Sequence, residues 1–555
     1  MTKKIILLFI LLSSIVSSQT NKMATIDSLL NKLSDSNAPG FSIGIIEDSK
    51  FVYTKGFGLA NLEYDIPNSS NSVFRIASTS KQFTAACIIL LIQKDKLKLN
   101  NTIYEYFPEF PEYSKKITIR HLLNHTSGIR DYLTLASLKD YGSNDYYNDT
   151  NIMQWLVSQN ELNFKPGSEY LYSNSGYWLL GQIVNKITGI NMADFAKKEI
   201  FEPLGMANTH FHNDHNLIVK NRAVGYMPKV DNDYRISMTT LNMIGDGGIF
   251  TTINDMKKWD DEFYNRTLFG DSFWKLMTTQ GILNDDNKIE YAAGLFIGEY
   301  RSLKTISHGG AFVGYRAEYI RFPEQKTSII LFANRGDLYP TGICYQIADI
   351  LFKDDFVESE NDINTIQKKD EFITMPIIKL EQFSGHYWND AGSYSRKIYV
   401  KNDTLRYSRS KTNESSLLPI NKNTFKMLNV NANILVKFEK DSIGNSNMVF
   451  SVNEGNPFIS KKYTPKNYKS EELQKFTGSY YSKELDMYYK LKVENGILVL
   501  YMSNSSKFEM KSIMENFLTN NRFGNIHFFF NSDSTIKGFK VARGRVKNLI
   551  FNKVE

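Results

Sequence analysis

A serine and a lysine stand three positions apart in the chain, Ser78 and Lys81, within the segment Phe74 to Ala85. An apolar run with helical spacing, Phe83 to Lys94, begins directly after them. In a helix this spacing puts both side chains on one face, one turn apart. A serine hydroxyl attacks a carbonyl when a neighbour takes its proton, and a helix start offers N–H groups to an oxyanion. The pair indicates an acyl-transfer nucleophile, although a capping serine beside a solvated lysine has the same spacing.

Four further segments follow Ser-x-x-Lys in a fixed order: Thr118–Ile129, Tyr172–Asn174, Gly247–Thr252 and His308–Gly310. With the first motif they resemble the serine β-lactamase and penicillin-binding protein superfamily, specifically its class C-like branch. That branch includes class C β-lactamases, D-alanyl-D-alanine carboxypeptidases, D-aminopeptidases and related esterases. The resemblance covers roughly residues 25–350 and implies a β-lactamase/transpeptidase-like fold.

The resemblance assigns a role to each side chain of the first three motifs. Ser78 would attack a carbonyl and form an acyl-enzyme, with Lys81 and Tyr172 sharing the general-base work. A tyrosine, with a reference pKa of about 10, is a base near pH 7 only if its phenolate is stabilised. A lysine ammonium nearby provides that stabilisation. Asn174 would hold Lys81 and a substrate amide by hydrogen bonds.

The last motif, His308-Gly309-Gly310, stands where the family has Lys-Thr-Gly or a His-x-Gly variant. Its resemblance implies an oxyanion hole made by the backbone N–H groups of Ser78 and Ala311. Glycines in a strand beside the site let the substrate backbone approach closely. A histidine is mostly neutral near pH 7, so we expect less dependence on a substrate carboxylate. It can still donate a hydrogen bond or assist Tyr172.

These residues predict a serine hydrolase that cleaves amide or ester bonds, as a peptidase or esterase on D-amino-acid or cell-wall-like substrates. Two alternatives stay open: a β-lactamase, and a penicillin-binding sensor without efficient turnover. No Ser-Asp-Asn motif and no deacylating glutamate of the class A type is found. We expect no cofactor and no metal.

Other reactive residues favour ordinary structural roles. Ser42 lies in a Gly-x-Ser-x-Gly pattern, but the residues after it read as strand, turn and strand and not as the helix that a nucleophile elbow needs. His210, His212 and His215 could bind zinc, yet a polar surface loop is favoured. Cys87, one of two cysteines, lies in an apolar stretch and reads as buried and unpaired with Cys344.

The elements around these residues predict an α+β domain over residues 19–352, with an antiparallel sheet, flanking helices and a helical subdomain. Two strand pairs are expected, one within Phe41–Gly58 and one within Tyr315–Asn334, the second turning at residues 323–326. Helices are expected near Phe83–Lys94 and Tyr177–Ile187.

The C-terminal part of the chain contains an internal repeat. After a charged linker, residues 353–371, residues 380–388 match residues 473–481 at an offset of 93 positions. We therefore predict two small all-β barrels, over 372–465 and 466–555, since closure removes exposed strand edges. They resemble the lipocalin-like units of some D-aminopeptidases.

Residues 1–18 are typical of a signal peptide: two lysines precede an apolar run from Ile5 to Val16 and small residues follow. We therefore expect a secreted protein, periplasmic or extracellular, without a stable membrane span. The formal net charge of +7 on 555 residues indicates no nucleic-acid partner. The expected partner is a small-molecule or peptide substrate, and a homodimer is left open.

Overall fold

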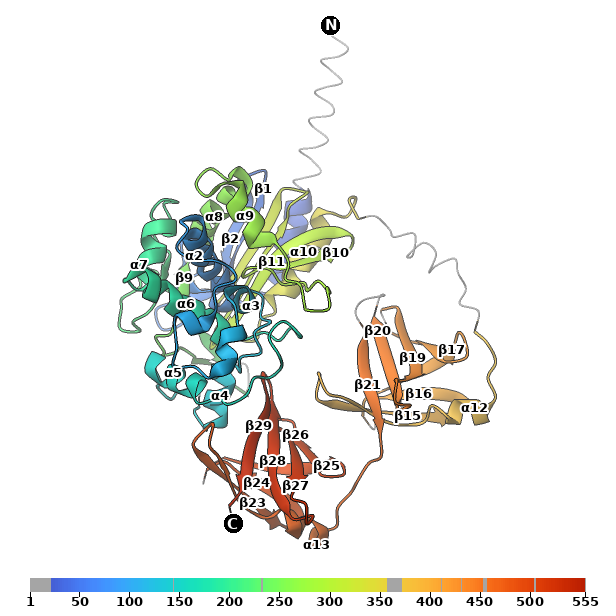
Figure 1. Ribbon diagram of the computed structural model, residues 1–555. Helices are drawn as coiled ribbons and strands as arrows, with labels where there is room; N and C mark the ends of the chain where they lie inside the picture. The colour runs from blue at the N-terminus through green and yellow to red at the C-terminus, as the bar shows by residue number, and fades with distance from the viewer. Residues whose placement is uncertain are drawn as a thin grey trace. The chain divides into compact units, whose positions relative to one another are not determined.

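The computed structural model describes residues 21–356, except 143, 231 and 232, and residues 372–554, except 411, 431, 453–456, 504 and 505. The predicted signal peptide, and the predicted linker from residue 357 on, lie outside the described residues. The chain divides into two compact units, Met1–Val357 and Glu358–Glu555. Each unit is described by itself (Figure 1).

The first unit is built on a six-stranded antiparallel sheet, as predicted. The strand order is β10 (Phe296–Tyr300), β11 (Leu303–Phe312), β12 (Tyr315–Phe322), β13 (Thr327–Ala333), β1 (Phe41–Glu47) and β2 (Lys50–Phe57). Both predicted strand pairs are present, β1 with β2 and β12 with β13. Asp48 and Ser49 have φ values of 45° and 60°, the backbone of a tight hairpin turn.

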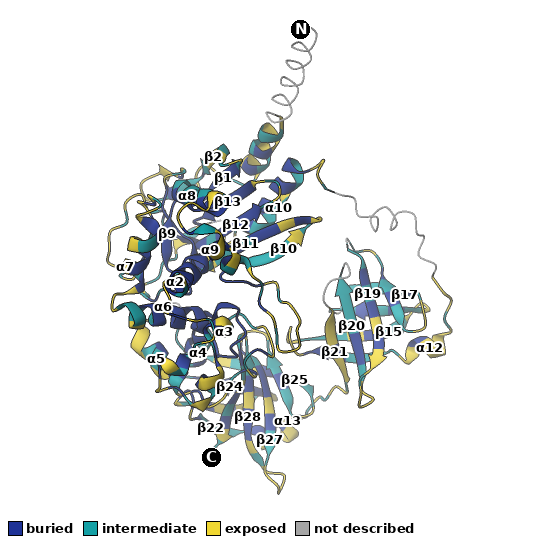
Figure 2. Ribbon diagram, turned by 45° about the horizontal axis from the view of Figure 1, so that its top comes forward, coloured by how far each residue is buried: buried dark blue, intermediate teal, exposed yellow. Residues whose placement is uncertain are grey.

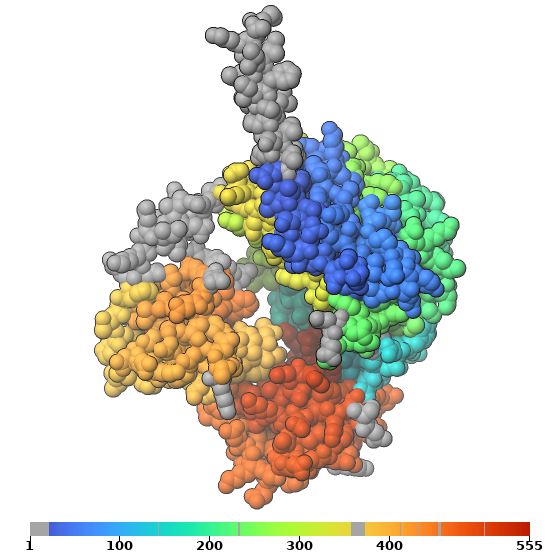
Figure 3. Space-filling view, turned by 180° about the vertical axis from the view of Figure 1, so that it is seen from behind, coloured from blue at the N-terminus to red at the C-terminus, as the bar shows by residue number. Residues whose placement is uncertain are grey.

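One face of this sheet is covered by two helices far apart in the sequence, residues 21–32 and α10 (Pro340–Leu351). Ile26 and Ile347 meet Ile43 and Leu331 of the sheet in one buried cluster. The central strands β1 and β13 are buried along nearly their whole length (Figure 2). In Figure 3 the blue N-terminal residues lie against the yellow residues near α10. This face carries one hydrophobic cluster, and the opposite face packs against the helices around Ser78.

Helices crowd the other face (Figure 1). They are α2 (Lys81–Gln93), α3 (Ile119–Leu123), α4 (Tyr132–Leu138), α5 (Asp149–Val157), α6 (Asn174–Thr188), α7 (Met192–Ala196), α8 (Ile253–Asn265) and α9 (Gly270–Thr278). Helix α2 is buried from Lys81 to Leu91 because its apolar side chains surround the axis. Cys87 of α2 and Cys344 of α10 are buried and free, as predicted.

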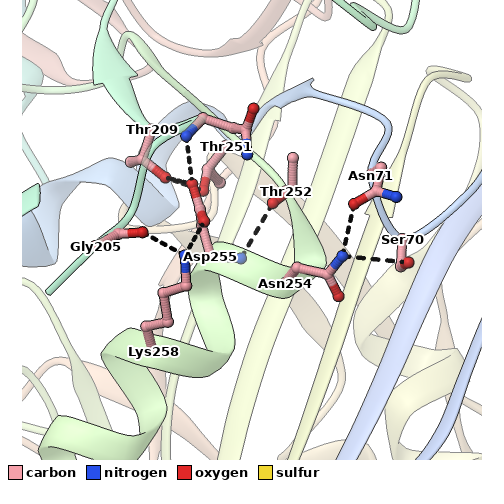
Figure 4. A network of polar contacts seen from close by, with 10 residues as sticks. Ser70, Asn71, Gly205, Thr209, Thr251, Thr252, Asn254, Asp255 and Lys258 are labelled. Atoms are coloured by element: carbon pink, nitrogen blue, oxygen red, sulfur yellow. Dashed lines mark hydrogen bonds and ion pairs between the residues drawn. The ribbon is translucent and has the colours of Figure 1, made fainter.

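A small three-stranded sheet joins the segment before Ser78 to the glycine-rich turn. Its central strand is β9 (Ile249–Thr251), which pairs with β5 (Phe74–Arg75) and β6 (His210–Phe211). Figure 4 shows how Asp255, near the start of α8, fixes one end of this sheet. Its carboxylate accepts hydrogen bonds from the backbone of Asn208 at 2.7 Å and from Thr209 Oγ1 at 3.0 Å.

The second unit contains two closed antiparallel barrels of eight strands each, as predicted. The first consists of β14 (Gly385–Asn389), β15 (Tyr394–Lys401), β16 (Thr404–Ser408), β17 (Glu414–Pro419), β18 (Thr424–Met427), β19 (Ile434–Lys440), β20 (Ser446–Val452) and β21 (Phe458–Tyr463). The second consists of β22 (Gly478–Ser482), β23 (Met487–Glu494), β24 (Ile497–Tyr501), β25 (Lys507–Met514), β26 (Phe517–Asn520), β27 (Gly524–Phe530), β28 (Ile536–Arg543) and β29 (Val546–Lys553).

The repeated sequence makes the same contact in both barrels. The Tyr387 hydroxyl donates to the Phe383 carbonyl at 2.8 Å, and the Tyr480 hydroxyl donates to the Phe476 carbonyl at 2.8 Å. Both tyrosines are buried in the interior of their barrels. The hydroxyl ties the chain that enters each barrel to its first strand, so the match in sequence reflects a shared way of closing the barrel.

Candidate active site

Ser78 lies in a single 3₁₀ turn, Ala77–Ser80, and α2 begins directly after it at Lys81. A 3₁₀ turn has about three residues per turn, so side chains three apart lie over one another. Lys81 Nζ is accordingly 3.3 Å from Ser78 Oγ. Ala77, just before the serine, has a φ of 48°, a strained backbone for a residue with a side chain.

Strand β11 and the small sheet hold this turn in place. The Ile76 N–H donates to the Ile249 carbonyl at 3.0 Å, and Thr79 Oγ1 donates to the His308 carbonyl at 3.1 Å. A Cβ atom on Gly310 would come within 2.1 Å of the Ile76 carbonyl oxygen. Glycine is therefore needed at 310 for β11 to lie directly against the turn that carries Ser78. The sequence alone predicts this glycine for substrate approach; in the structure its close neighbour is the protein's own backbone.

Lys81 is fully buried and points into a set of oxygen acceptors. Besides Ser78 Oγ, its Nζ donates to Asn174 Oδ1 at 2.9 Å and to the Asp246 carbonyl oxygen at 2.5 Å. An ammonium has three protons and no lone pair, so three acceptors match the charged form of the lysine. Asn174 therefore holds Lys81 in the way the resemblance implies.

Tyr172 stands between Lys81 and His125. Its ring centroid is 4.9 Å from Lys81 Nζ, a cation–π distance, and 4.1 Å from the His125 ring centroid. Nδ1 of His125 accepts a hydrogen bond from the Ser173 N–H at 3.1 Å, which fixes the histidine ring. His125, in the Thr118–Ile129 motif, thus packs against the ring of Tyr172.

The Tyr-x-Asn segment is anchored by the loop before α4. Asp131 Oδ2 accepts from the Asn174 N–H at 2.8 Å, while its Oδ1 caps α4 by accepting from the Thr134 N–H at 3.1 Å. Ser175 Oγ donates to the Arg130 carbonyl at 2.7 Å. The C-terminal end of the segment is therefore fixed independently of any substrate.

His308 is buried on β11, and both of its ring nitrogens have partners. Nδ1 lies 2.6 Å from the Gly309 carbonyl oxygen and Nε2 lies 3.0 Å from the Tyr291 hydroxyl. A carbonyl only accepts, so the proton is on Nδ1, and Nε2 accepts from Tyr291. Burial, together with the charge of Lys81, lowers the pKa of His308 to about 3. The histidine is neutral, as its residue type led us to expect, while its donor is directed at the protein.

The remaining predicted residues lie along β11. Gly309 pairs with Glu318 and Ala311 pairs with Arg316 of β12. Ala311 is exposed, one residue beyond the contact of Gly310 with the turn. The oxyanion role of Ser78 and Ala311, and the catalytic role of His308, stay predictions.

Two contributors to the site were not predicted. Tyr291 is fully buried and its hydroxyl bonds to His308. The backbone carbonyl of Asp246 accepts from Lys81, and the side-chain carboxyl of Asp246 accepts from the Tyr132 hydroxyl at 2.9 Å. The sequence signal for Tyr291 is slight: a glycine, Gly294, follows three residues later. In the structure Gly294 has a φ of 73°, and a Cβ atom added to it would lie 2.7 Å from the Gln82 backbone. For Asp246 the signal is its place before the glycine-rich segment at Gly247.

The alternative reactive residues lie elsewhere. Ser42 is a buried residue of β1 whose hydroxyl donates to the Ser69 carbonyl at 2.8 Å, as expected for a strand residue. The surface loop expected at the three histidines is wrong for His210 and His212. His210 lies in β6, and His212 is only 3% exposed and contacts the Phe250 ring. Among the described residues no group of three potential ligands could hold a metal ion.

Comparison with known proteins gives a family and several relatives. A family model described as Beta-lactamase matches residues 26–343. Penicillin-binding protein 4* of Bacillus subtilis is 28% identical over 331 residues, which cover 57% of this chain and 73% of that protein. A D-aminopeptidase of Gluconobacter oxydans is 27% identical over 297 residues, 53% of this chain. The matched region spans only 56% of that aminopeptidase.

Solved structures share the fold. The octameric penicillin-binding protein homologue from Pyrococcus abyssi has a TM-score of 0.55 at 23% identity, covering 79% of this chain and 100% of that one. A D-amino acid amidase from Ochrobactrum anthropi SV3, complexed with D-phenylalanine, has a TM-score of 0.52 at 22% identity. That match covers 60% of this chain and 99% of the amidase.

Proposed function

The chain belongs to the beta-lactamase family of serine hydrolases, and from this premise we propose that it cleaves amide or ester bonds through a Ser78 acyl-enzyme. The substrates are peptides or amides with D-amino acids, or related cell-wall fragments. The observation that carries the proposal is the buried Lys81 ammonium, which joins Ser78 Oγ to Asn174 Oδ1 beside the Tyr172 ring.

The hydrogen bonds favour Tyr172 as the group that takes the serine proton. All three Lys81 protons have acceptors, so the lysine serves as a cation that stabilises a Tyr172 phenolate. Ser78 Oγ attacks the carbonyl carbon and its proton passes to Tyr172. Tyr172 then protonates the leaving amine or alcohol. In the second half, water attacks the acyl carbon and gives its proton to Tyr172. Tyr172 then returns a proton to Ser78 Oγ, which leaves as the acid is released.

The oxyanion that forms in each step is stabilised by the backbone N–H groups of Ser78 and Ala311. The contact of Gly310 with the Ile76 carbonyl supports this assignment, because it brings β11 against the Ser78 turn. The Nδ2 group of Asn174, opposite the oxygen that holds Lys81, is then the donor for a substrate amide.

The neutral His308 bears on substrate choice. A cation at this place would bind a substrate carboxylate, whereas neutral His308 has its ring nitrogens directed at Gly309 and Tyr291. This favours amides and esters over substrates that need a free carboxylate beside the scissile bond. The names of the relatives, a D-aminopeptidase and a D-amino acid amidase, point to D-residues on the acyl side.

We propose that the protein acts outside the cytoplasm. The apolar run from Ile5 to Val16 behind two lysines supports export. In the described part of the chain no helix has the length and apolarity required to cross a bilayer. A peptide or small molecule is the proposed partner, and a homodimer remains a proposal of the same kind.

The test is turnover and labelling with the full chain, using D- and L-phenylalanine amide, p-nitrophenyl acetate, nitrocefin and a fluorescent penicillin. We expect turnover of the D-amide and the ester, with an acyl adduct on Ser78 by mass spectrometry. Ser78→Ala should abolish both, while Ser42→Ala, a buried serine of β1, should retain them. Nitrocefin hydrolysis as the fastest reaction would instead make it a β-lactamase. Stable penicillin labelling without any turnover would make it a sensor, and equal turnover by Ser78→Ala would refute the site.

A further inference from the structure

Each barrel of the second unit has a groove across its first three strands. The first groove has a volume of about 730 Å³ and crosses β14, β15 and β16 of the first barrel. Its wall is completed by residues 465 and 467 and by residues 511–513 of β25, a strand of the second barrel. In the second barrel the groove has a volume of about 520 Å³ and crosses β22, β23 and β24. At the repeat offset of 93 residues, β14, β15 and β16 correspond to β22, β23 and β24.

The two grooves are lined at the same positions of the repeat. Six lining residues of the first groove are His386, Ser395, Lys397, Tyr399, Ser408 and Arg409. Adding the repeat offset of 93 to each number gives six lining residues of the second: Ser479, Tyr488, Lys490, Lys492, Tyr501 and Met502. This part of the lining is therefore common to the two copies of the repeated module.

A lysine occupies the centre of both grooves. Across the strands of the first barrel, Lys397 is paired with His386 on one side and Ser408 on the other. In the second barrel Lys490 is paired with Ser479 and Tyr501 in the same way. Neighbours along the strand, such as Ile398 and Leu491, are buried in the barrel interior, so the lysines point outward.

The rest of the lining has diverged in sequence while keeping its chemistry. Lys397 Nζ is 5.2 Å from the ring centroid of Tyr399 in the first groove. In the second groove the position of that tyrosine is taken by Lys492, whose Nζ is 5.2 Å from the ring centroid of Tyr501. Both grooves therefore contain a lysine beside a tyrosine ring, although the two pairs occupy different positions of the repeat. The common origin of the barrels does not by itself explain this likeness.

The charges of both grooves are of one sign. Lys397, Arg409 and Lys511 line the first and Lys490 and Lys492 the second, and neither lining includes a carboxylate. Two carboxylates lie at the edges: Glu414 accepts from the Tyr399 hydroxyl and pairs with Lys401, and Glu494 accepts from the Tyr501 hydroxyl and pairs with Lys507. Within the described residues the lining lysines pair with neither carboxylate, and Arg409 donates to neutral oxygens such as Ser415 Oγ at 3.0 Å. Cations gathered on one concave surface, and not paired with the carboxylates at its edge, attract an anion.

We propose that the two grooves bind an anionic polysaccharide, one segment of the same chain in each. Tyrosine rings and serine hydroxyls beside the lysines suit sugar rings that carry carboxylates. Two grooves that share lining positions in one polypeptide suit a ligand that repeats along its length, because the second segment binds at a high effective concentration. A nucleic acid is disfavoured by the modest net charge of +7 over 555 residues. This binding is independent of the chemistry proposed for Ser78.

The experiment measures binding of oligogalacturonate to the full chain carrying Ser78→Ala, so that turnover plays no part. Lys397→Ala or Lys490→Ala should each weaken binding about tenfold, as expected for loss of one charge-assisted contact. The double variant should weaken it further than either. Matched controls are Lys440→Ala and Lys537→Ala, exposed lysines on β19 and β28, which should bind as the parent does.

Three results would overturn the proposal. One is equal weakening by the control variants, which would indicate nonspecific attraction. Another is equal binding of neutral maltohexaose, which would remove the role of charge. The third is equally tight binding of single-stranded oligodeoxythymidylate, which would make the grooves a surface for any polyanion. Failure of Ser78 to react with any substrate would leave these binding results unchanged.

Discussion

Glu318 provides a sharp test of the buried electrostatics behind β11. It lies on β12 opposite Gly309, is 3% exposed, and accepts a hydrogen bond from Thr341 Oγ1. Burial raises the pKa of its carboxyl from 4.5 to about 7. The perturbation is Glu318→Gln, which keeps the size and the acceptor oxygen and removes the titration.

The magnitude follows from linkage between protonation and folding. Below pH 4.5 the carboxyl is protonated in both the folded and the unfolded chain. Between pH 4.5 and about 7 the unfolded chain loses the proton and the folded chain keeps it, so stability falls as pH rises. Each tenfold change in protonation corresponds to about 1.4 kcal/mol, which gives a loss of about 3 kcal/mol at pH 8 and about 1 kcal/mol at pH 5. Between pH 5 and pH 8 the free energy of unfolding should therefore fall by about 2 kcal/mol more in the parent than in Glu318→Gln.

The assay is urea unfolding followed by tryptophan fluorescence at pH 5 and pH 8. Four of the five tryptophans, at 155, 178, 259 and 274, lie in the first unit, so the signal reports mainly on the domain that contains Glu318. Glu109→Gln, at an exposed position, is the matched control and should keep the parent's pH dependence. The same pH dependence in Glu318→Gln as in the parent would refute the reasoning.

Three further predictions concern the site. Tyr172→Phe keeps the ring but removes the proposed proton acceptor, so kcat on an ester should fall about a thousandfold with KM little changed; a fall of less than tenfold would contradict the role. Tyr291→Phe removes the donor to His308 Nε2, which favours the neutral ring, so the pKa of His308 should rise. The pH profile of kcat/KM should then gain an acidic limb, and an unchanged profile would argue against the coupling. Gly310→Ala places a Cβ within 2.1 Å of a backbone oxygen and should destabilise the first unit by about 2 kcal/mol. Gly298→Ala on β10, with its nearest atom at 3.5 Å, should cost far less, and equal urea midpoints for the two would refute this account.

The elements that the sequence predicted are those whose cause is local. The pairing of β1 with β2, the helix near Phe83–Lys94, and the position of Ser78 and Lys81 one turn apart each depend on a few neighbouring residues. The two barrels were predicted from the repeat around Tyr387 and Tyr480, and the structure shows the same local contact in both copies.

The parts that were missed depend on contacts across the fold. Tyr291 reaches His308 only because β10 pairs with β11, and Asp246 acts through a backbone carbonyl, which no side-chain motif records. Gly310 was recognised as special, yet its partner, the Ile76 carbonyl, lies 234 positions earlier in the chain. His212 was assigned to the surface because its polar neighbours gave no sign of the sheet that buries it.

The duplicated barrel also has a consequence for how the chain acquires its fold. Two neighbouring modules whose first strands begin with nearly the same residues can exchange them during folding, and such misassembly is a known failure of tandem repeats. The tyrosine-to-carbonyl bond within each module, Tyr387 to Phe383 and Tyr480 to Phe476, closes over only four residues. Contacts between residues so close in sequence form faster than pairings between the modules, whose matching residues lie 93 positions apart. The bond that marks the two barrels as copies therefore also helps each copy to select its own strand.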